Sequence, residues 1–147
     1  MNYKPKAMKK IFLILLFLVP IITYAQELNC KKFTKNSAID LLGDFILSGR
    51  THSLELAEGE EVVVFKTVSR NLVYKFVVIA DKHIPQPRFL IADWDNNIIF
   101  DNAKHNFQDT FVFPCDKTQR IKIWIKVPGK DANKRGCVSL VVGVKTQ

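Results

Sequence analysis

The chain has 147 residues, of which 22 are basic and 14 acidic, giving a formal net charge of +8. Its first 25 residues contain four lysines and no acid, so the remaining 122 residues carry a net charge of only +4. These remaining basic residues are mostly dispersed, which argues against a nucleic-acid partner, because nucleic-acid binders usually gather basic residues on one face. The length suits a single domain with one core.

The N-terminal segment has the form of a secretory signal. Lysines precede a 12-residue apolar run, Ile11–Ile22, and small residues follow at Thr23 and Ala25. This pattern predicts a signal peptide over residues 1–25, cleaved after Ala25, and a periplasmic or extracellular mature protein. The run is shorter than the roughly 20 residues that span a bilayer. We therefore expect no membrane span after cleavage, with an uncleaved N-terminal anchor as the alternative.

Residues 26–147 are predicted to form one domain, with a helical lead-in over 26–45 and strands over 50–144. Within the lead-in, apolar residues recur every three to four positions at Ala38, Leu41, Leu42 and Phe45. This spacing predicts a short amphipathic helix, which Gly43 could end. We expect the helix to cover one edge or end of a sheet.

All three cysteines, Cys30, Cys115 and Cys137, lie in the mature chain. An oxidising compartment favours one disulfide and leaves one thiol. The predicted strand between Cys115 and Cys137 would hold their ends about 20 Å or more apart, and a disulfide needs Cα atoms within about 7 Å. Cys30 is free to reach either partner, and the pair that we favour is Cys30–Cys137.

Short strands separated by turn signals follow the helical lead-in. Their regular spacing predicts an all-β fold, an antiparallel, jelly-roll-like β-sandwich of about eight strands. The predicted strands are Ser53–Leu56, Glu61–Val68, Leu72–Ala80, Arg88–Asp93, Asn97–Asp101, Gln108–Phe113, Arg120–Val127 and Gly136–Val144.

Two of these strands carry clear face patterns. In 120–127, Ile121, Ile123, Ile125 and Val127 alternate with Arg120, Lys122, Trp124 and Lys126. The isoleucine face is therefore predicted to face the core and the other face to meet water. The strand Leu72–Ala80 is apolar on both faces, which predicts that it is covered on both sides.

The outward face of 120–127 is also the candidate binding surface. Trp124 stands between Lys122 and Lys126, and a second tryptophan, Trp94, lies at a predicted turn. An exposed tryptophan could stack on a sugar or anchor a protein partner, since Trp is enriched at binding hot spots. The alternative is that the helix, a second sheet or the lysine stems cover Trp124.

Oxygen-bearing side chains alternate at Asp93, Asp95 and Asn97, and Asp101 follows. This is the opening of an EF-hand loop, so Ca²⁺ is a candidate cofactor. The rest of that loop is missing, because Ile98 replaces the glycine and Lys104 replaces the bidentate glutamate. We therefore favour a hairpin turn, which Asp and Asn also suit, over a Ca²⁺ site.

The segments 72–78, 89–93, 100–102, 118–123 and 136–140 occur in a recurring order. That order resembles a set of small, uncharacterised secreted proteins of Gram-negative bacteria. The strand layout is more distantly similar to the pre-peptidase C-terminal domain, a β-sandwich appended to secreted hydrolases, although that domain usually has an aromatic residue where this chain reads Gly136-Cys137-Val138. The resemblance implies export and a sandwich, and implies no catalytic residues.

Catalysis has little support in the sequence. The three histidines are isolated, and no serine lies in a nucleophile elbow. We therefore predict a non-catalytic binding or accessory domain that recognises a glycan or an envelope protein. The alternative is a structural subunit of a cell-envelope assembly. An enzyme, with a dyad of Cys115 and a histidine, is the third candidate.

Overall fold

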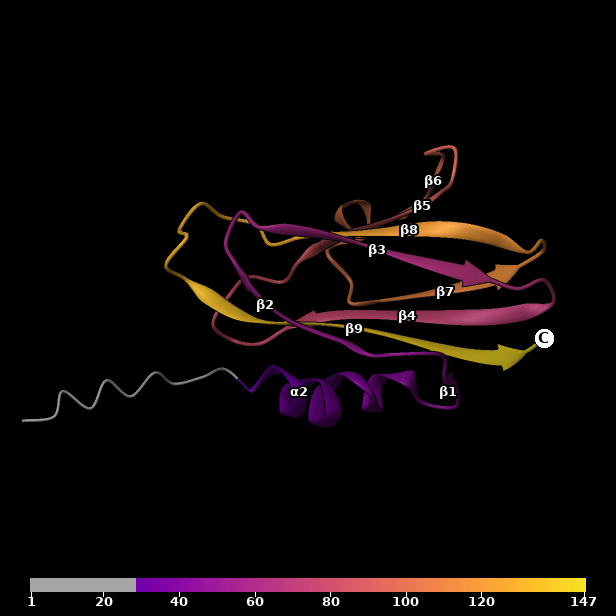
Figure 1. Cartoon of the computed structure of the whole chain (residues 1–147), viewed down its shortest axis with the longest axis horizontal. Coiled ribbons are helices and arrows are strands. Elements are labelled where there is room, and N and C mark those ends of the chain that lie inside the picture. The colour runs from indigo at the N-terminus through magenta and orange to yellow at the C-terminus, as the bar shows by residue number, and fades with distance from the viewer. Residues whose placement is uncertain (1–28) are drawn as a thin grey trace, which may run out of the picture.

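The computed structural model describes residues 29–147. Two antiparallel sheets pack face to face, and a helical segment lies against the outer side of one of them (Figure 1). The predicted signal peptide, 1–25, lies outside the described residues. No helix within 29–147 has the length and apolar character that a bilayer crossing requires.

Sheet A is built on its longest strand, β9 (Arg135–Thr146). On one side of β9 lie β4 (Leu72–Ala80) and then β7 (Thr110–Cys115). On the other side lie two short strands, β1 (Ile46–Leu47) and β2 (His52–Ala57). Because β1 and β2 pair with successive parts of β9, they form one edge strand that is interrupted over residues 48–51.

Sheet B has the strand order β3-β8-β5-β6. Its strands are β3 (Glu61–Val68), β8 (Gln119–Lys126), β5 (Arg88–Asp93) and β6 (Ile98–Asp101). Together with β2-β9-β4-β7, this order gives the two four-stranded sheets of a jelly roll, in which each sheet draws its strands from both halves of the chain. The predicted all-β sandwich is thus confirmed.

All eight predicted strands are present, with small differences. β1 was not predicted, because a two-residue strand carries no periodic pattern. β7 was predicted to end before Pro114, but it continues through Pro114 to Cys115. The prediction failed because β7 is an edge strand. The proline nitrogen, which carries no hydrogen, can face the open edge, where no strand needs it as a donor.

The main core lies between the two sheets. The isoleucines of β8 are fully buried there, which confirms their predicted orientation. They meet side chains of β4 and β9, such as Phe76 and Leu140, that point inward from sheet A. This core fixes sheet B so that every second residue of its strands faces outward.

A second, smaller core lies between the helical segment and sheet A. The segment comprises α2 (Cys30–Phe33), a π-helical turn η2 (Thr34–Ala38) and a 3₁₀ turn η3 (Asp40–Leu42). It buries Ala38 and Leu42 against Val77, Ile79 and Val141. This explains why β4 is apolar on both faces. Our prediction that the helix covers an edge or end of a sheet was wrong, because β4 and β9 present apolar residues across the outer side of sheet A.

Candidate functional site

The outer face of sheet B is the surface to which most of the predicted binding residues belong. Directly opposed residues of antiparallel strands point to the same side. β3 and β5 pair with β8, and β6 pairs with β5, so their outward side chains lie in rows across the sheet. We use the term outer face for these side chains and Trp94. They are Glu61, Val63, Phe65, Thr67, Arg88, Leu90, Ala92, Ile98, Asp101, Arg120, Lys122, Trp124 and Lys126.

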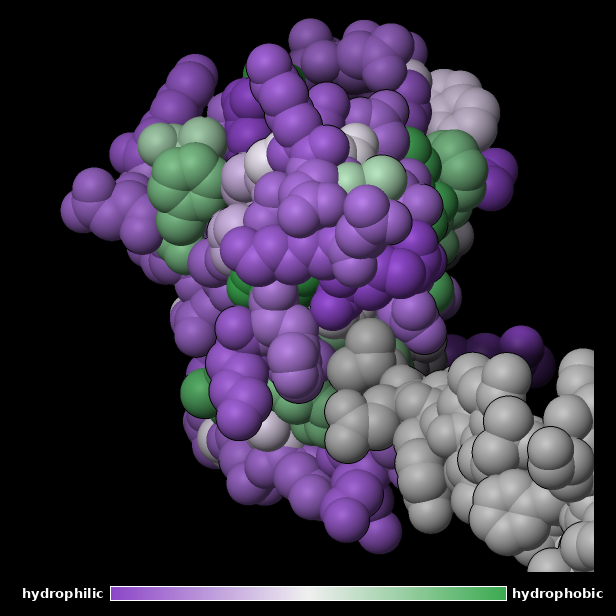
Figure 2. Space-filling model, turned by 90° about the vertical axis from the view of Figure 1, so that its left-hand side faces the viewer, coloured by the Kyte–Doolittle hydropathy of each residue, from purple (hydrophilic) through white to green (hydrophobic). Residues whose placement is uncertain are grey.

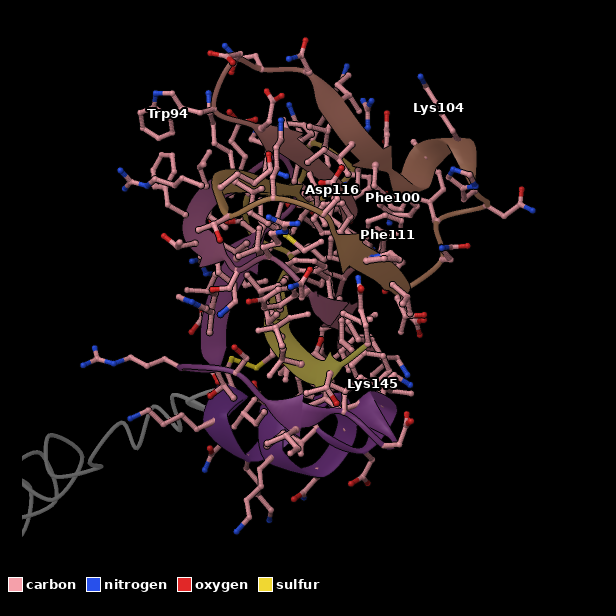
Figure 3. The ribbon with its side chains drawn as sticks, turned by 90° about the vertical axis from the view of Figure 1, so that its right-hand side faces the viewer. Trp94, Phe100, Lys104, Phe111, Asp116 and Lys145 are labelled. Carbon is pink, nitrogen blue, oxygen red and sulfur yellow. A yellow bond between two sulfur atoms is a disulfide. The ribbon has the colours of Figure 1, made fainter. Side chains whose placement is uncertain are left out.

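An aromatic and cationic cluster occupies one half of the outer face. The guanidinium carbon of Arg120 lies 5.0 Å from the ring centre of Phe65 and 4.8 Å from that of Trp94. The two rings are 6.0 Å apart. Trp94 points away from the body of the molecule in Figure 3, and the exposed fractions of Phe65 and Trp94 are 49% and 54%. Each ring therefore holds the cation by a cation–π contact while part of it meets solvent.

Trp124 occupies the other half and is only partly exposed. Arg88 lies 5.8 Å and Lys126 lies 5.9 Å from its ring centre. Arg88 is also paired with the buried carboxylate of Asp101, with Nη2 and Oδ2 2.6 Å apart. Hydrogen bonding to Arg88 lowers the pKa of Asp101, and the same pair raises the pKa of Arg88. Arg88 and Lys126 thus flank the ring of Trp124. The side chain of Trp94 is more exposed and therefore more accessible to a partner.

Charge is unevenly balanced across the outer face. Arg88 and Lys126 have carboxylate partners in Asp101 and Glu61. Among the described residues, neither Arg120 nor Lys122 forms an ion pair, and Lys122 donates a hydrogen bond to the side-chain oxygen of Asn96 instead. The aromatic cluster therefore carries an uncompensated positive charge.

The end of the sandwich that holds the β2–β3, β4–β5 and β8–β9 connections differs from the outer face (Figure 1). Figure 2 shows that end as mostly hydrophilic, with hydrophobic residues gathered toward its two sides. Four large hydrophobic residues of the outer face are exposed, namely Val63, Phe65, Trp94 and Ile98. Exposed apolar groups rimmed by charge are typical of interaction sites, so the outer face is a stronger candidate than the end shown in Figure 2.

The structure brings all four predicted binding residues, Lys122, Trp124, Lys126 and Trp94, to one face. The helix was one predicted cover for Trp124, but it lies on sheet A. Sequence reasoning missed Phe65, Arg88 and Arg120 as members of the site. Polar Glu61 and Thr67 fall on the same face of β3 as Val63 and Phe65, which could have indicated an outward face. Only the register with β8 places Phe65 beside Lys122.

The four predicted calcium ligands do not converge on one site. Asp93 and Asn97 bond to each other, whereas Asp101 bonds to Arg88. Asp93 accepts hydrogen bonds from the backbone and side-chain nitrogens of Asn97, at 2.8 Å each. Asp101 points to Arg88, and Asp95 is exposed in the turn. Within residues 29–147, no group of three or more His, Cys, Asp or Glu residues is arranged to hold a metal ion. The segment Asp93–Asn97 forms the turn between β5 and β6.

We therefore expect Ca²⁺ to leave the stability of the mature protein unchanged. Its thermal unfolding midpoint should be the same in millimolar CaCl₂ and in EDTA, because Asp93 already uses both carboxylate oxygens within the turn. Differential scanning fluorimetry tests this, with MgCl₂ as the control for ionic strength. A saturable rise with Ca²⁺ alone, abolished in Asp95→Asn, would instead establish a calcium site.

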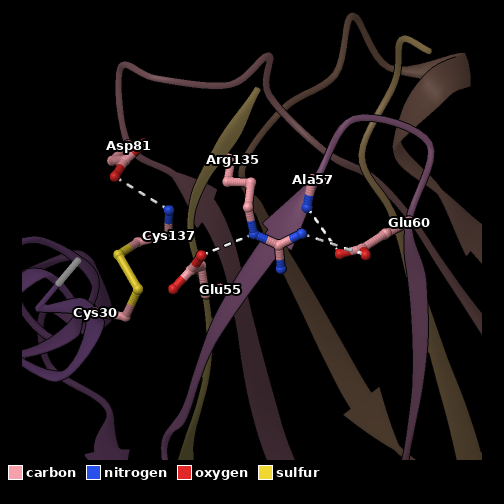
Figure 4. Close-up of polar contacts among 7 residues, drawn as sticks. All are labelled: Cys30, Glu55, Ala57, Glu60, Asp81, Arg135 and Cys137. Carbon is pink, nitrogen blue, oxygen red and sulfur yellow. Dashed lines mark hydrogen bonds and ion pairs between the residues drawn. A yellow bond between two sulfur atoms is a disulfide. The ribbon is translucent and has the colours of Figure 1, made fainter. Parts of the chain in front are cut away.

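The favoured cysteine pair, Cys30–Cys137, is joined in the structure, with Cα atoms 5.1 Å apart. It ties the start of the helical segment to β9 (Figure 4). Asp81 accepts a hydrogen bond from the Cys137 backbone N–H at 3.1 Å and thereby holds the β9 side of the bridge. Nearby, Arg135 pairs with Glu55 at 2.8 Å. A disulfide of this kind is typical of an exported protein.

Cys115 is the free thiol, and it is buried. Burial raises the pKa of this thiol, and its Sγ donates to the carbonyl oxygen of Lys117 at 3.0 Å. A thiol nucleophile needs the opposite setting, with a lowered pKa and access to solvent. This environment does not suit Cys115 to the catalytic dyad considered from the sequence.

Comparisons with known proteins bear on the fold alone. No family model matches the chain, and no curated protein matches it. The chain is similar in structure to PliG of Aeromonas hydrophila, a periplasmic lysozyme inhibitor of g-type lysozyme. The TM-score is 0.50 and the identity 8%, over 69% of this chain and 89% of that chain. None of these findings supports the distant similarity to pre-peptidase C-terminal domains.

Proposed function

We propose that this protein is an exported, non-catalytic binding domain whose outer face docks onto an acidic surface of a partner protein. The proposal rests on the arrangement of Arg120, which lies between two half-exposed rings and has no carboxylate partner among the described residues. Tyrosine, tryptophan and arginine are the residues that most often dominate protein–protein binding energy. A partner carboxylate would complete this cluster.

A protein partner fits this face better than a neutral glycan. Sugars stack on free aromatic ring faces, whereas the rings of Trp94 and Trp124 are each approached by two cationic side chains. The face is built from paired strands and carries exposed apolar residues beside the cations. Such a combination complements an acidic protein surface in both charge and hydrophobicity.

The structural neighbour adds one relevant point. PliG is described as an inhibitor of g-type lysozyme, so in that protein a fold of this kind serves to bind another protein. A g-type lysozyme is therefore a concrete first partner to assay with the mature chain. If inhibition were seen but did not change in Trp94→Ala or Arg120→Glu, the binding site would lie elsewhere than on the outer face.

The proposal predicts that a partner from the producing organism's envelope fraction crosslinks to the wild-type mature protein through the outer face. Arg120→Glu and Trp94→Ala should each abolish most of this crosslink. Truncating a hot-spot residue costs about 2 kcal/mol or more, or roughly thirtyfold in affinity. Quantitative mass spectrometry of the captured proteins measures the effect for each variant.

Two control variants match these changes elsewhere on the molecule. Lys35→Glu reverses an exposed charge on the helical segment, and Val112→Ala truncates an exposed apolar side chain on β7 of sheet A. Both should capture the partner as the wild type does. Equal capture by Arg120→Glu and the wild type would remove the outer face as the docking site, and selective binding on a neutral glycan array would favour the glycan alternative.

A further inference from the structure

A cleft opens between the two sheets where the edge strand of sheet A is interrupted. Its volume is about 150 Å³. Residues 48–51 separate β1 from β2 there. The Ser48 backbone N–H still donates to the Val142 carbonyl of β9 at 2.7 Å, and residues 49–51 continue without strand pairing to β9. The lining side chains come from this interruption and from β2, β3, β8 and β9; they are Arg50, His52, Val64, Phe65, Lys66, Ile123, Leu140 and Val142.

The floor of the cleft is apolar. Ile123, Leu140 and Val142 belong to the main core, and each is buried. Protein interiors are normally close-packed, with few voids larger than a water molecule. A cavity of about 150 Å³ lined by apolar groups is large enough to hold a benzene molecule. The floor can therefore accept a small apolar group.

The mouth of the cleft is cationic. Arg50, His52 and Lys66 line it, and no carboxylate does. Among the described residues, none of the three forms an ion pair, and Lys66 donates its one hydrogen bond to the carbonyl oxygen of Ser48 at 3.0 Å. Burial lowers the pKa of Lys66; burial and the nearby Lys66 lower that of His52. His52 is therefore neutral at neutral pH, and the positive groups at the mouth are Lys66, which is partly desolvated, and Arg50, which is exposed. Neither has a carboxylate partner within the described residues.

We propose that this cleft binds a small organic monoanion, with its apolar group on the floor formed by Ile123, Leu140 and Val142 and its anionic group beside Lys66 and Arg50. A carboxylate would gain charge-assisted hydrogen bonds from both cations. The hydrogen bond from Lys66 to the Ser48 carbonyl gives Lys66 a structural role, because it holds the interruption in place. That hydrogen bond does not involve Arg50, whose exposed side chain at the mouth is left for an anion to contact.

This site is separate from the docking proposal, because neither Trp94 nor Arg120 lines the cleft. Only Phe65 is shared between the two, so the test leaves Phe65 unchanged. Failure of one proposal therefore leaves the other in place.

Benzoate is the probe, because its ring matches the cavity volume and it carries one negative charge. Titrated into the mature protein, it should bind saturably and shift the methyl NMR signals of Ile123, Leu140 and Val142. Benzyl alcohol tests the ring without the charge, and inorganic phosphate tests charge without the ring. Each should bind at least about tenfold more weakly than benzoate.

Lys66→Met and Arg50→Gln should each weaken benzoate binding by about tenfold or more, and the exposed control Arg70→Gln should have no effect. If Lys66→Met failed to fold, Arg50→Gln would decide, since no hydrogen bond from its side chain is lost within the described residues. Absence of saturable benzoate binding, equal binding of benzyl alcohol, or wild-type affinity in Arg50→Gln would overturn the proposal.

Discussion

Replacing both members of the disulfide, as Cys30→Ala with Cys137→Ala, is expected to lower the free energy of unfolding by about 2–4 kcal/mol. The bridge joins residues 107 positions apart. A crosslink over so long a loop stabilises mainly by restricting the unfolded chain. It also holds α2 beside sheet A, so the double variant should open the small core around Val77 and Val141 more readily. Urea unfolding measures the total change.

Two controls separate the bridge from the cysteines themselves. Reducing the wild type with dithiothreitol should reproduce most of the loss and leave the double variant unchanged. Cys115→Ala keeps the bridge and removes only a buried sulfur, so its cost should be smaller. If reduction left the unfolding free energy of the wild type unchanged, the bridge would not contribute to stability as we describe.

Asn102→Ala is expected to destabilise the protein by about 3 kcal/mol, since buried groups left without partners cost about 1–3 kcal/mol each. Asn102 is fully buried at the end of β6, at the start of the 3₁₀ turn η4 (Asn102–Lys104). Its side-chain oxygen accepts from the Phe89 N–H at 2.9 Å, and its nitrogen donates to the carbonyls of Pro87 and Gln108 at 3.0 and 3.2 Å. One side chain thus holds together the chain entering β5, the end of β6 and the loop before β7.

Asn97→Ala is the matched control for this variant. Asn97 also makes two hydrogen bonds, one from its backbone and one from its side chain, but Asn97 is exposed and both bonds go to Asp93 in the β5–β6 turn. Water can replace the side-chain bond there, so the cost should stay below about 1 kcal/mol. Chemical denaturation of both variants compares them directly. Similar losses for Asn97→Ala and Asn102→Ala would contradict the structural role of Asn102.

The strands could be predicted because turn residues separate short segments rich in β-branched and aromatic residues, and in β8 because its residues also alternate. The structure places the strands within a few residues of the expected bounds. The position of the helical segment could not, because its Ala38 and Leu42 indicate an apolar side without indicating which surface it covers. The apolar residues on the outer side of β4, such as Val77 and Ile79, could have indicated the surface that the helical segment covers. The disulfide could be favoured from sequence because strand length alone separates Cys115 from Cys137.

The candidate site was predictable only in part. Lys122, Trp124 and Lys126 share a face by alternation within one strand, which a sequence shows directly. Phe65 and Arg120 meet because β3 pairs with β8 in one particular register, and a single sequence does not contain that register. The turn after β5 then adds Trp94 from outside any strand. The site is a product of strand pairing more than of any motif.

The most direct test of the outer face is the affinity of the captured partner for the wild type and for Arg120→Glu, measured by calorimetry at low and high salt. We expect charge reversal to weaken binding by roughly thirtyfold or more at low salt. The difference should shrink as added salt screens the partner's acidic groups. Equal affinities of the wild type and Arg120→Glu at low salt, with Lys35→Glu also unchanged, would contradict docking through the outer face.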